Sequence, residues 1–361
     1  MVIVFLSNLT VLFREVLLEM ARLFCCITVL HLLLLFKLNI SAEAGVVGVN
    51  YGMLGNNLPP PRRVIALLKS RNITSIRLYD PNHDALQALQ NSGIKVILGT
   101  LNQDLQMLGA ADPSFARSWV STNVIPYSKT VHFRCISAGN EVIPSDLAAY
   151  VFPAMKNLKA ALNAAELAYI PVTTCVSTAI LGASYPPSRG EFSKDSSLVM
   201  RSVAAFLAAN GSPLLVNVYP YFPYVDNQEE IPLSYALFNS TNVVVKDGQL
   251  EYRNLFDAIT DAVYAALEKV GGASIQIVVS ESGWPSKENG DIATVANAQM
   301  YVNNLIAHVS GETGTPKRPG KSIESYIFAL FNENLKPPGT EQNFGLYNPD
   351  MTEVYPVDFT H

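Results

Sequence analysis

Residues 275–286 read IQIVVSESGWPS, and this stretch decides the fold. Four of the first five residues are apolar and β-branched, which is typical of a strand buried on both faces in a parallel sheet. Gly283 and Pro285 then end the strand and turn the chain. We therefore expect Glu281 at the carboxyl end of a buried strand, beside Trp284. In α/β barrels this end of each strand carries the catalytic groups.

A second stretch, residues 132–144, has the same design. It reads HFRCISAGNEVIP, a short apolar strand that ends in a polar segment with Glu141. Glu281 alone could simply cap the following helix, but a glutamate is rarely buried without a partner. Hydrolysis of a glycosidic bond needs two carboxyl groups, one as acid/base and one as nucleophile. We therefore interpret Glu141 and Glu281 as a candidate catalytic pair.

The composition indicates a large globular domain and excludes several other functions. The chain has 361 residues, of which 49% are hydrophobic and 15% charged, so a large core is expected. A net charge of −5 without a basic block gives no electrostatic support for nucleic-acid binding. The sequence has no complete phosphate-binding loop, no paired metal-ligand spacing and no G-x-S-x-G motif. We expect no cofactor and no metal.

The first 44 residues differ from the rest of the chain. A largely apolar run at 23–36 follows Arg22 and precedes an A-x-A site at 42–44, which predicts a signal peptide over residues 1–44. Met20 is an alternative start. The run is shorter than the ~20 residues of a spanning helix, so we expect a mature chain, 45–361, without a membrane span. We expect a secreted monomer in the extracellular space or cell wall, with glycosylation sequons at Asn72 and Asn239.

Two cysteines, Cys135 and Cys175, belong to the mature chain, and both lie in predicted strands. We favour two free buried thiols, although sequence alone leaves a bridge between them open.

From Gly45 onward, strand-like and helix-like segments alternate, which predicts parallel βαβ units. Eight strands indicate closure into a single (β/α)8 TIM barrel over residues 45–361, with an open doubly wound sheet as the alternative. The segment 221–253 is interpreted as an insertion after strand six that shapes the site. The expected strands are 46–50, 75–78, 94–99, 133–138, 172–177, 214–220, 275–279 and 324–334, the last including its polar end.

In such a barrel, the carboxyl ends of all eight strands meet at one opening. The residues expected there are mostly aromatic and amide side chains, which can stack on sugar rings and bind hydroxyl groups. This combination predicts a polysaccharide cleft. Its expected residues, besides the two glutamates, are Asn50, Tyr51, Tyr79, Asn140, Asn217, Tyr219, Tyr221 and Trp284.

Six motifs in order resemble those of plant endo-1,3-β-glucanases of glycoside hydrolase family 17. The resemblance covers about residues 45–359 and implies a (β/α)8 barrel and a retaining double displacement. It implies that Glu141 is the acid/base and Glu281 the nucleophile, and that Glu324, Glu333 and Lys336 belong to the substrate cleft. The motifs are VGVNYG (47–52), RLYD (77–80), GNEV (139–142), SESGWPS (280–286), FNEN (331–334) and FGLY (344–347).

The resemblance implies hydrolysis of internal β-1,3 bonds in glucans such as callose or fungal wall glucan. Two alternatives stay open at this point. A mixed-linkage β-1,3-1,4-glucanase would share both glutamates and differ in the shape of its cleft. A non-catalytic cell-wall glucan-binding protein would need the cleft alone, and the two intact glutamates argue against it. The biological role, whether plant defence, callose turnover or development, is not indicated by the sequence.

Overall fold

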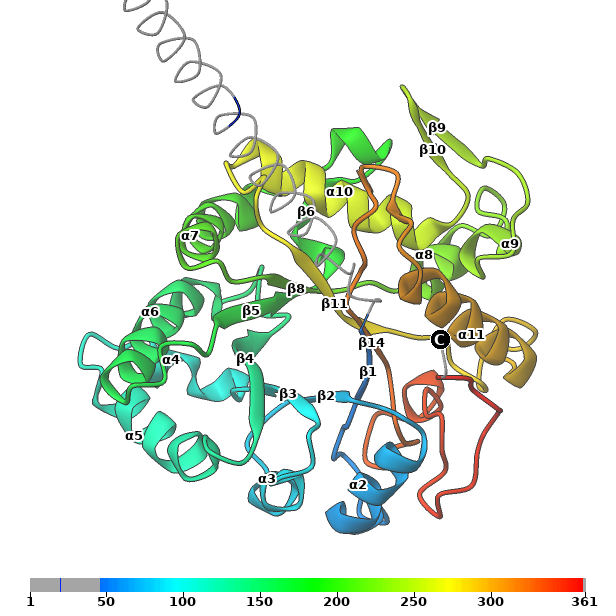
Figure 1. The fold of residues 1–361 in the computed structure, drawn as a ribbon. Helices are drawn as coiled ribbons and strands as arrows, with labels where there is room; N and C mark the ends of the chain where they lie inside the picture. Colours follow the sequence, from blue (N-terminus) through cyan, green and yellow to red (C-terminus); the bar gives the residue numbers. More distant parts are fainter. Residues whose placement is uncertain (1–19, 21–45, 360–361) are drawn as a thin grey trace, which may run out of the picture. The chain divides into compact units, whose positions relative to one another are not determined.

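Eight parallel strands form a closed barrel at the centre of the molecule (Figure 1). Each strand pairs with its neighbours in chain order, and the last strand returns to pair with the first, so the sheet has no free edge. The expected barrel is therefore confirmed, and the open sheet is excluded. The strands are β1 (Val47–Asn50), β2 (Ser75–Leu78), β3 (Lys95–Gly99), β4 (His132–Asn140), β5 (Val172–Val176), β8 (Leu214–Asn217), β11 (Ile277–Ser282) and β14 (Ser325–Ile327).

This computed structural model describes Met20 and residues 46–359. Except for Met20, the predicted signal peptide lies outside the described residues. None of the helices that the structure describes is long and apolar enough to cross a membrane.

Each connection between consecutive barrel strands contains at least one α-helix, and these helices surround the barrel (Figure 1). They bury one apolar face each, as α2 does with Val64, Ile65 and Leu68. Within the described residues no α-helix follows β14, and the segment from residue 328 contains only the 3-10 turn η5 (Thr340–Gln342). The helices are α2 (Pro61–Ser70), α3 (His83–Leu89), α4 (Leu105–Leu108), α5 (Ser114–Asn123), α6 (Ala148–Ala164), α7 (Lys194–Asn210), α10 (Leu255–Lys269) and α11 (Val295–Ser310).

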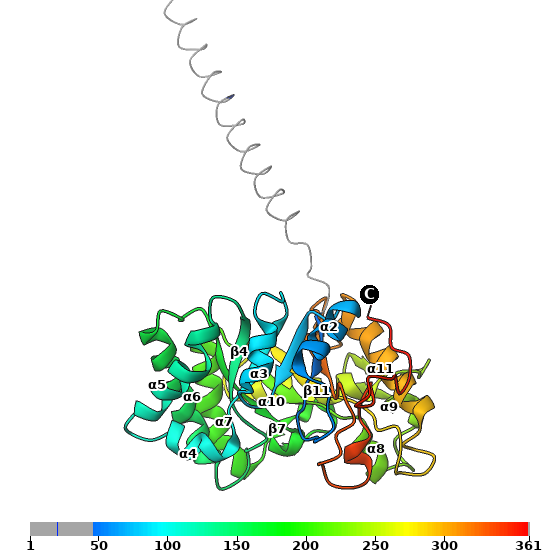
Figure 2. The ribbon, with the colours of Figure 1, turned by 90° about the horizontal axis from the view of Figure 1, so that it is seen from below.

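Several short elements lie outside the barrel and its helices. The connection from β8 to α10 contains α8 (Tyr221–Asp226), α9 (Leu233–Ala236) and a hairpin of β9 (Val245–Asp247) and β10 (Leu250–Tyr252). Two further hairpins pair β6 (Leu181–Ala183) with β7 (Glu191–Phe192), and β12 (Gly314–Thr315) with β13 (Arg318–Pro319). Seen from the side, α4 and α8 lie at the same end of the barrel, which is the end toward which the strands run (Figure 2).

The barrel interior is filled by side chains from six different strands, so the barrel is a packed core. Both thiols belong to it, and both are free and buried, which confirms the favoured interpretation. Gly48 is required by this packing, because a Cβ atom there would lie 2.5 Å from the ring of Tyr326. The cluster consists of Ile97, Cys135, Cys175, Leu215, Val278 and Tyr326.

Candidate active site

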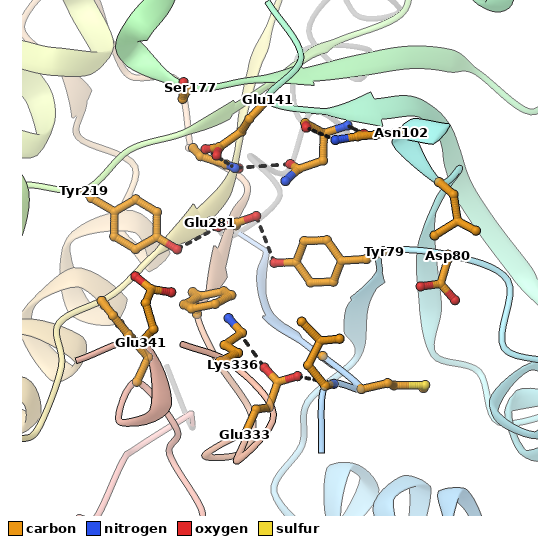
Figure 3. Close-up of a pocket in the computed structure, with 18 of the residues that line it drawn as sticks. Tyr79, Asp80, Asn102, Glu141, Ser177, Tyr219, Glu281, Glu333, Lys336 and Glu341 are labelled. Atoms are coloured by element: carbon orange, nitrogen blue, oxygen red, sulfur yellow. Dashed lines mark hydrogen bonds and ion pairs between the residues drawn. The ribbon is translucent and has the colours of Figure 1, made fainter. Parts of the chain in front are cut away.

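A pocket of about 910 Å³ opens at the carboxyl ends of the barrel strands (Figure 3). Both glutamates of the predicted pair line it, although they lie 140 residues apart in the sequence. The structure also brings six other predicted site residues to its wall. These are Tyr79, Asn140, Asn217, Tyr219, Glu333 and Lys336.

Glu281, on β11, is buried at the base of the pocket, with an exposed fraction of 6%. Its Oε1 accepts hydrogen bonds from the Tyr79 hydroxyl at 2.8 Å and from Arg77 Nη1 at 2.9 Å. Its Oε2 accepts one from the Tyr219 hydroxyl at 2.7 Å (Figure 3). Burial and the neighbouring Glu281 charge raise the pKa of both tyrosines well above its usual value, so both stay protonated and donate.

Glu141 follows the last residue of β4 and has a left-handed backbone, with φ +55°. Its backbone N–H donates to the Cys175 carbonyl at 3.0 Å. Its carboxyl points into the pocket, and Oε1 accepts a 2.8 Å hydrogen bond from Asn217 Nδ2. Partial burial, and then the negative charge of Glu281, raise the pKa of Glu141. The two carboxyl groups therefore have different surroundings, one held by three donors and the other favoured in its protonated form.

Arg77, on β2, links the residues around the two glutamates, and it is 1% exposed. Besides Glu281, Nη1 donates to Asn217 Oδ1 at 3.1 Å, and Nη2 donates to Asn140 Oδ1 at 2.6 Å. Arg77 belongs to the RLYD motif (77–80), but its place in the site was not predicted from the sequence. An arginine in a strand with buried neighbours was the signal, because a buried guanidinium needs acceptors.

Asn102, which the sequence analysis missed, fixes the residue that precedes Glu141. Its Oδ1 accepts from the Asn140 N–H at 2.7 Å, and its Nδ2 donates to the Asn140 carbonyl at 2.9 Å. Asn102 lies just beyond β3, so the polar residues after strand three were the signal that could have found it.

Glu333 and Lys336 form a second charged group on the pocket wall (Figure 3). Glu333 Oε1 accepts from the Leu54 N–H at 2.6 Å, and Lys336 Nζ lies 3.7 Å from Oε2. A Cβ atom on residue 52 would lie 2.4 Å from Glu333 Oε2, so Gly52 is needed for the carboxylate to approach this closely. Lys336 Nζ also lies 4.0 Å from the centroid of the Phe328 ring.

Residues 47–359 match the model of the family Glycosyl hydrolases family 17. This chain belongs to that family. It is therefore a glycoside hydrolase, as the two pocket glutamates indicated. Within the part of the chain that the structure describes, no group of three or more potential ligand side chains is arranged to hold a metal ion.

Two curated relatives and a solved structure are similar to this chain over most of their length. A glucan endo-1,3-beta-glucosidase of Vitis vinifera is 50% identical over 345 residues, which cover 94% of this chain and 98% of the relative. Lichenase-2 of Hordeum vulgare is 49% identical over 313 residues, covering 87% and 98%. The structure of CJP38, a beta-1,3-glucanase and allergen of Cryptomeria japonica pollen, has a TM-score of 0.84 and 48% identity, covering 87% and 98%.

Four predicted site residues lie behind the pocket wall of this family 17 chain. Asn50 Oδ1 accepts from the Tyr79 hydroxyl at 3.1 Å, so Asn50 supports the wall from below. Tyr51 is buried with its ring edge against Phe331. Trp284 is fully buried and packs against the ring of Tyr221, 5.1 Å away between centroids. Asn50, Tyr51, Tyr221 and Trp284 were expected on the cleft surface, but all four are buried and none of them lines the pocket.

Glu324 is also misplaced by the sequence analysis. It precedes β14, so it lies at the amino end of a barrel strand, while the pocket is at the carboxyl ends. Its Oε2 lies 2.9 Å from Arg134 Nη2, and its Oε1 accepts from the Tyr326 hydroxyl at 2.9 Å. It pairs with a cation near the opposite end of the barrel and does not reach the cleft.

The connection from β8 contributes less to the site than expected. From the interval 221–253, Phe222 and Pro223 line the pocket, while the β9–β10 hairpin contacts α10. The C-terminal segment contributes more than expected, with Glu341 and Phe344 on the pocket wall.

Proposed function

We propose that this protein hydrolyses internal β-1,3-glucosidic bonds in β-1,3-glucans, such as callose or fungal wall glucan, with retention of configuration. One observation carries the proposal: Glu141 and Glu281 face a single open pocket. Burial raises the pKa of Glu141, while three hydrogen-bond donors hold the carboxylate of Glu281. Family 17 membership and the similarity to plant glucan endo-1,3-beta-glucosidases support the same activity.

In the proposed mechanism the two carboxyl groups divide the work. Glu281 attacks the anomeric carbon while Glu141 donates its proton to the departing glycosidic oxygen, so the C–O bond breaks and a glycosyl-enzyme ester forms. Glu141, now ionised, then removes a proton from water as the water attacks the same carbon and releases Glu281. The buried donors Arg77, Tyr79 and Tyr219 hold the attacking carboxylate in place.

The pKa of Glu141 determines the proposed pH dependence. The first step needs Glu141 protonated, and burial raises its pKa, which extends the protonated range to higher pH. Activity should therefore fall as pH rises through this raised pKa.

The rest of the pocket wall is suited to a glucan chain. Asn140, Glu333 and Lys336 supply polar groups for sugar hydroxyls, and the rings of Phe222 and Phe344 supply apolar faces. We assign these residues to substrate binding as part of the proposal. We further propose that the protein acts as a secreted monomer in the cell wall. The N-terminal sequence of the secreted protein would test removal of the signal peptide, and its size in solution would test the monomer.

The first experiment is product analysis on laminarin, a soluble β-1,3-glucan, with the anomeric configuration followed by NMR. We expect oligosaccharides of mixed length whose first-formed anomer is β. An α-anomer formed first would contradict the nucleophile role of Glu281.

Substitution of Glu281 tests its assignment as the nucleophile directly. Glu281→Gln should lower kcat by about 10⁴-fold or more, because the attacking carboxylate is lost while glucan binding remains. Glu324→Gln is the matched control, since Glu324 lies outside the pocket, and it should keep wild-type turnover. Binding of laminarin without turnover by the wild-type protein would instead favour a non-catalytic glucan-binding protein.

A mixed-linkage β-1,3-1,4-glucanase is the second candidate activity. It is favoured by the similarity to Lichenase-2, which is nearly as close as the similarity to the glucan endo-1,3-beta-glucosidase. Comparing kcat/KM on laminarin and on barley mixed-linkage glucan separates the two. We expect the higher value on laminarin.

A further inference from the structure

We propose that Ser280 and Cys175 are positioning residues for the acid/base. By holding the carboxamide of Asn217 in one orientation, they keep the transferable proton of Glu141 on Oε2. This inference rests on the proposed function of Glu141. It assigns a role to two buried side chains that have no exposed surface and cannot touch the substrate.

The orientation of the Asn217 carboxamide follows from its neighbours. An arginine carries only hydrogen-bond donors, so the Asn217 atom 3.1 Å from Arg77 Nη1 must be the oxygen, Oδ1. Ser280 Oγ donates to the same oxygen at 2.8 Å, and Cys175 Sγ donates at 3.1 Å. Ser280 Oγ and Cys175 Sγ are also 3.2 Å apart, so the hydroxyl group and the thiol group form one buried cluster beside Asn217.

The opposite face of the carboxamide then fixes the proton on Glu141. With Oδ1 turned toward the cluster, Nδ2 faces Glu141 and donates to Oε1 at 2.8 Å. A hydrogen already points at Oε1, so the carboxyl proton is placed on Oε2, the oxygen without this contact. A reversed carboxamide would present an acceptor to Oε1. It would draw the proton to that oxygen, where it could not be donated to the departing glycosidic oxygen.

Other charged groups near Glu141 would remain in place when the cluster is changed. Burial and the charges of Glu281 and Glu341 raise the pKa of Glu141, while the Asn217 hydrogen bond and Arg77 lower it. Cys175 contributes no charge, because burial raises the pKa of its thiol to about 12. The basic limb of the pH profile therefore reports the carboxamide contact when only Ser280 or Cys175 is replaced.

The test measures kcat and KM against pH on laminarin for Ser280→Ala and Cys175→Ala in the secreted protein. Loss of a donor to Oδ1 loosens the carboxamide, so its N–H contact with Glu141 weakens. We expect kcat to fall about three- to tenfold, the basic limb to move to higher pH by up to about one unit, and KM to stay unchanged.

Matched controls exist for both variants. Cys135→Ala removes a thiol that is equally buried on the neighbouring strand and packs in the same barrel interior. Ser282→Ala removes a buried hydroxyl from β11 that pairs with Tyr301 instead of Asn217. Both should lower the thermal unfolding midpoint as the test variants do, yet keep the wild-type pH profile.

Two conservative changes complete the design. Cys175→Ser keeps a donor and should restore the wild-type profile. Asn217→Asp keeps the shape but replaces the N–H donor to Glu141 with a negatively charged carboxylate, so it should move the basic limb further upward than either alanine variant and marks the upper limit of the shift. The inference is overturned if Ser280→Ala and Cys175→Ala both have the pH profile of the Cys135→Ala control, whatever the profile of Asn217→Asp. An inactive wild-type protein would instead refute the proposed function, so the two failures are distinguishable.

Discussion

At the scale of single residues, the proposed site depends on hydrogen-bond donors placed around one buried carboxylate. Tyr79 and Tyr219 approach different oxygens of Glu281, so each hydroxyl orients the carboxylate from its own side. A hydrogen bond to a charged group contributes about 1.5–3 kcal/mol, more than a neutral one. Tyr79 and Tyr219 therefore orient the proposed nucleophile and also line the pocket.

Removing one of these hydroxyl groups gives a direct prediction. Tyr219→Phe keeps the ring but removes the 2.7 Å donor to Glu281 Oε2, so we expect kcat to fall about 10- to 100-fold. Steady-state kinetics on laminarin measure this loss. Tyr221→Phe is the control, because its hydroxyl accepts from Asn289 and its ring packs on Trp284, outside the pocket. Equal activity of the two variants would argue against a role for the Tyr219 hydroxyl.

The sequence predicted some residues of the site well because their signal is local. Glu141 and Glu281 each follow an apolar strand, and the barrel brings the ends of such strands together. Arg77 and Asn102 were missed as site residues because their contacts join residues far apart in the chain, such as Arg77 with Glu281, 204 positions apart. Trp284 was misassigned for a related reason, since a sequence does not tell which face of a turn is covered by the core.

At the scale of elements, the largest error concerned the eighth strand. The interval 324–334 was interpreted as one strand with its polar end, but β14 contains only Ser325–Ile327. The chain bends after it, and Glu333 reaches the pocket from the following loop. Glu324 therefore lies before the strand and Glu333 lines the pocket beyond it, a difference that the apolar pattern of the sequence could not show.

Another element-scale feature is the buried carboxyl of Asp261, which joins α10 to two hairpins. Its Oδ2 accepts from the Tyr252 hydroxyl of β10 at 3.0 Å and from the Lys317 N–H of the β12–β13 turn at 2.9 Å. Burial is the main cause that raises the pKa of Asp261 from 3.8 to about 6, and the nearby Asp257 adds to it.

The raised pKa of Asp261 predicts how stability changes with pH. Between about pH 4 and pH 6 the folded state binds this proton more tightly than the unfolded state, so the free energy of unfolding falls as pH rises through this window. Asp261→Asn should remove this dependence and be more stable than wild type above pH 6, by up to about 3 kcal/mol for a shift of about two units. Denaturant unfolding at pH 4 and pH 7.5 measures the difference.

An exposed carboxyl serves as the control for Asp261. Asp146→Asn changes the same functional group at the surface, where solvent surrounds it, and should leave the pH dependence of wild type intact. A difference between Asp261→Asn and wild type that stays constant from pH 4 to pH 7.5 would contradict the assignment.

At the scale of the whole molecule, the site exists only because the barrel closes. β1 completes the ring by pairing with β14 through Val47↔Ser325 and with β2 through Asn50↔Arg77. Asn50 adds a side-chain hydrogen bond, in which Nδ2 donates to the Ile327 carbonyl at 3.2 Å. β1 thus links β2, which carries Arg77, to β14, and β14 pairs with β11, the strand that carries Glu281.

Barrel closure can be tested by comparing a chain that starts at Gly45 with one that starts at Gly52. The longer chain contains all eight strands, so we expect it to unfold cooperatively and to hydrolyse laminarin. The shorter chain lacks β1, which leaves β2 and β14 as unpaired edges and takes away the Asn50 support beneath Tyr79. We expect it to aggregate or to lose cooperative unfolding in circular dichroism, with no measurable hydrolysis. Activity in the shorter chain would mean that residues 52–361 can hold Arg77, Glu141 and Glu281 together without a closed barrel.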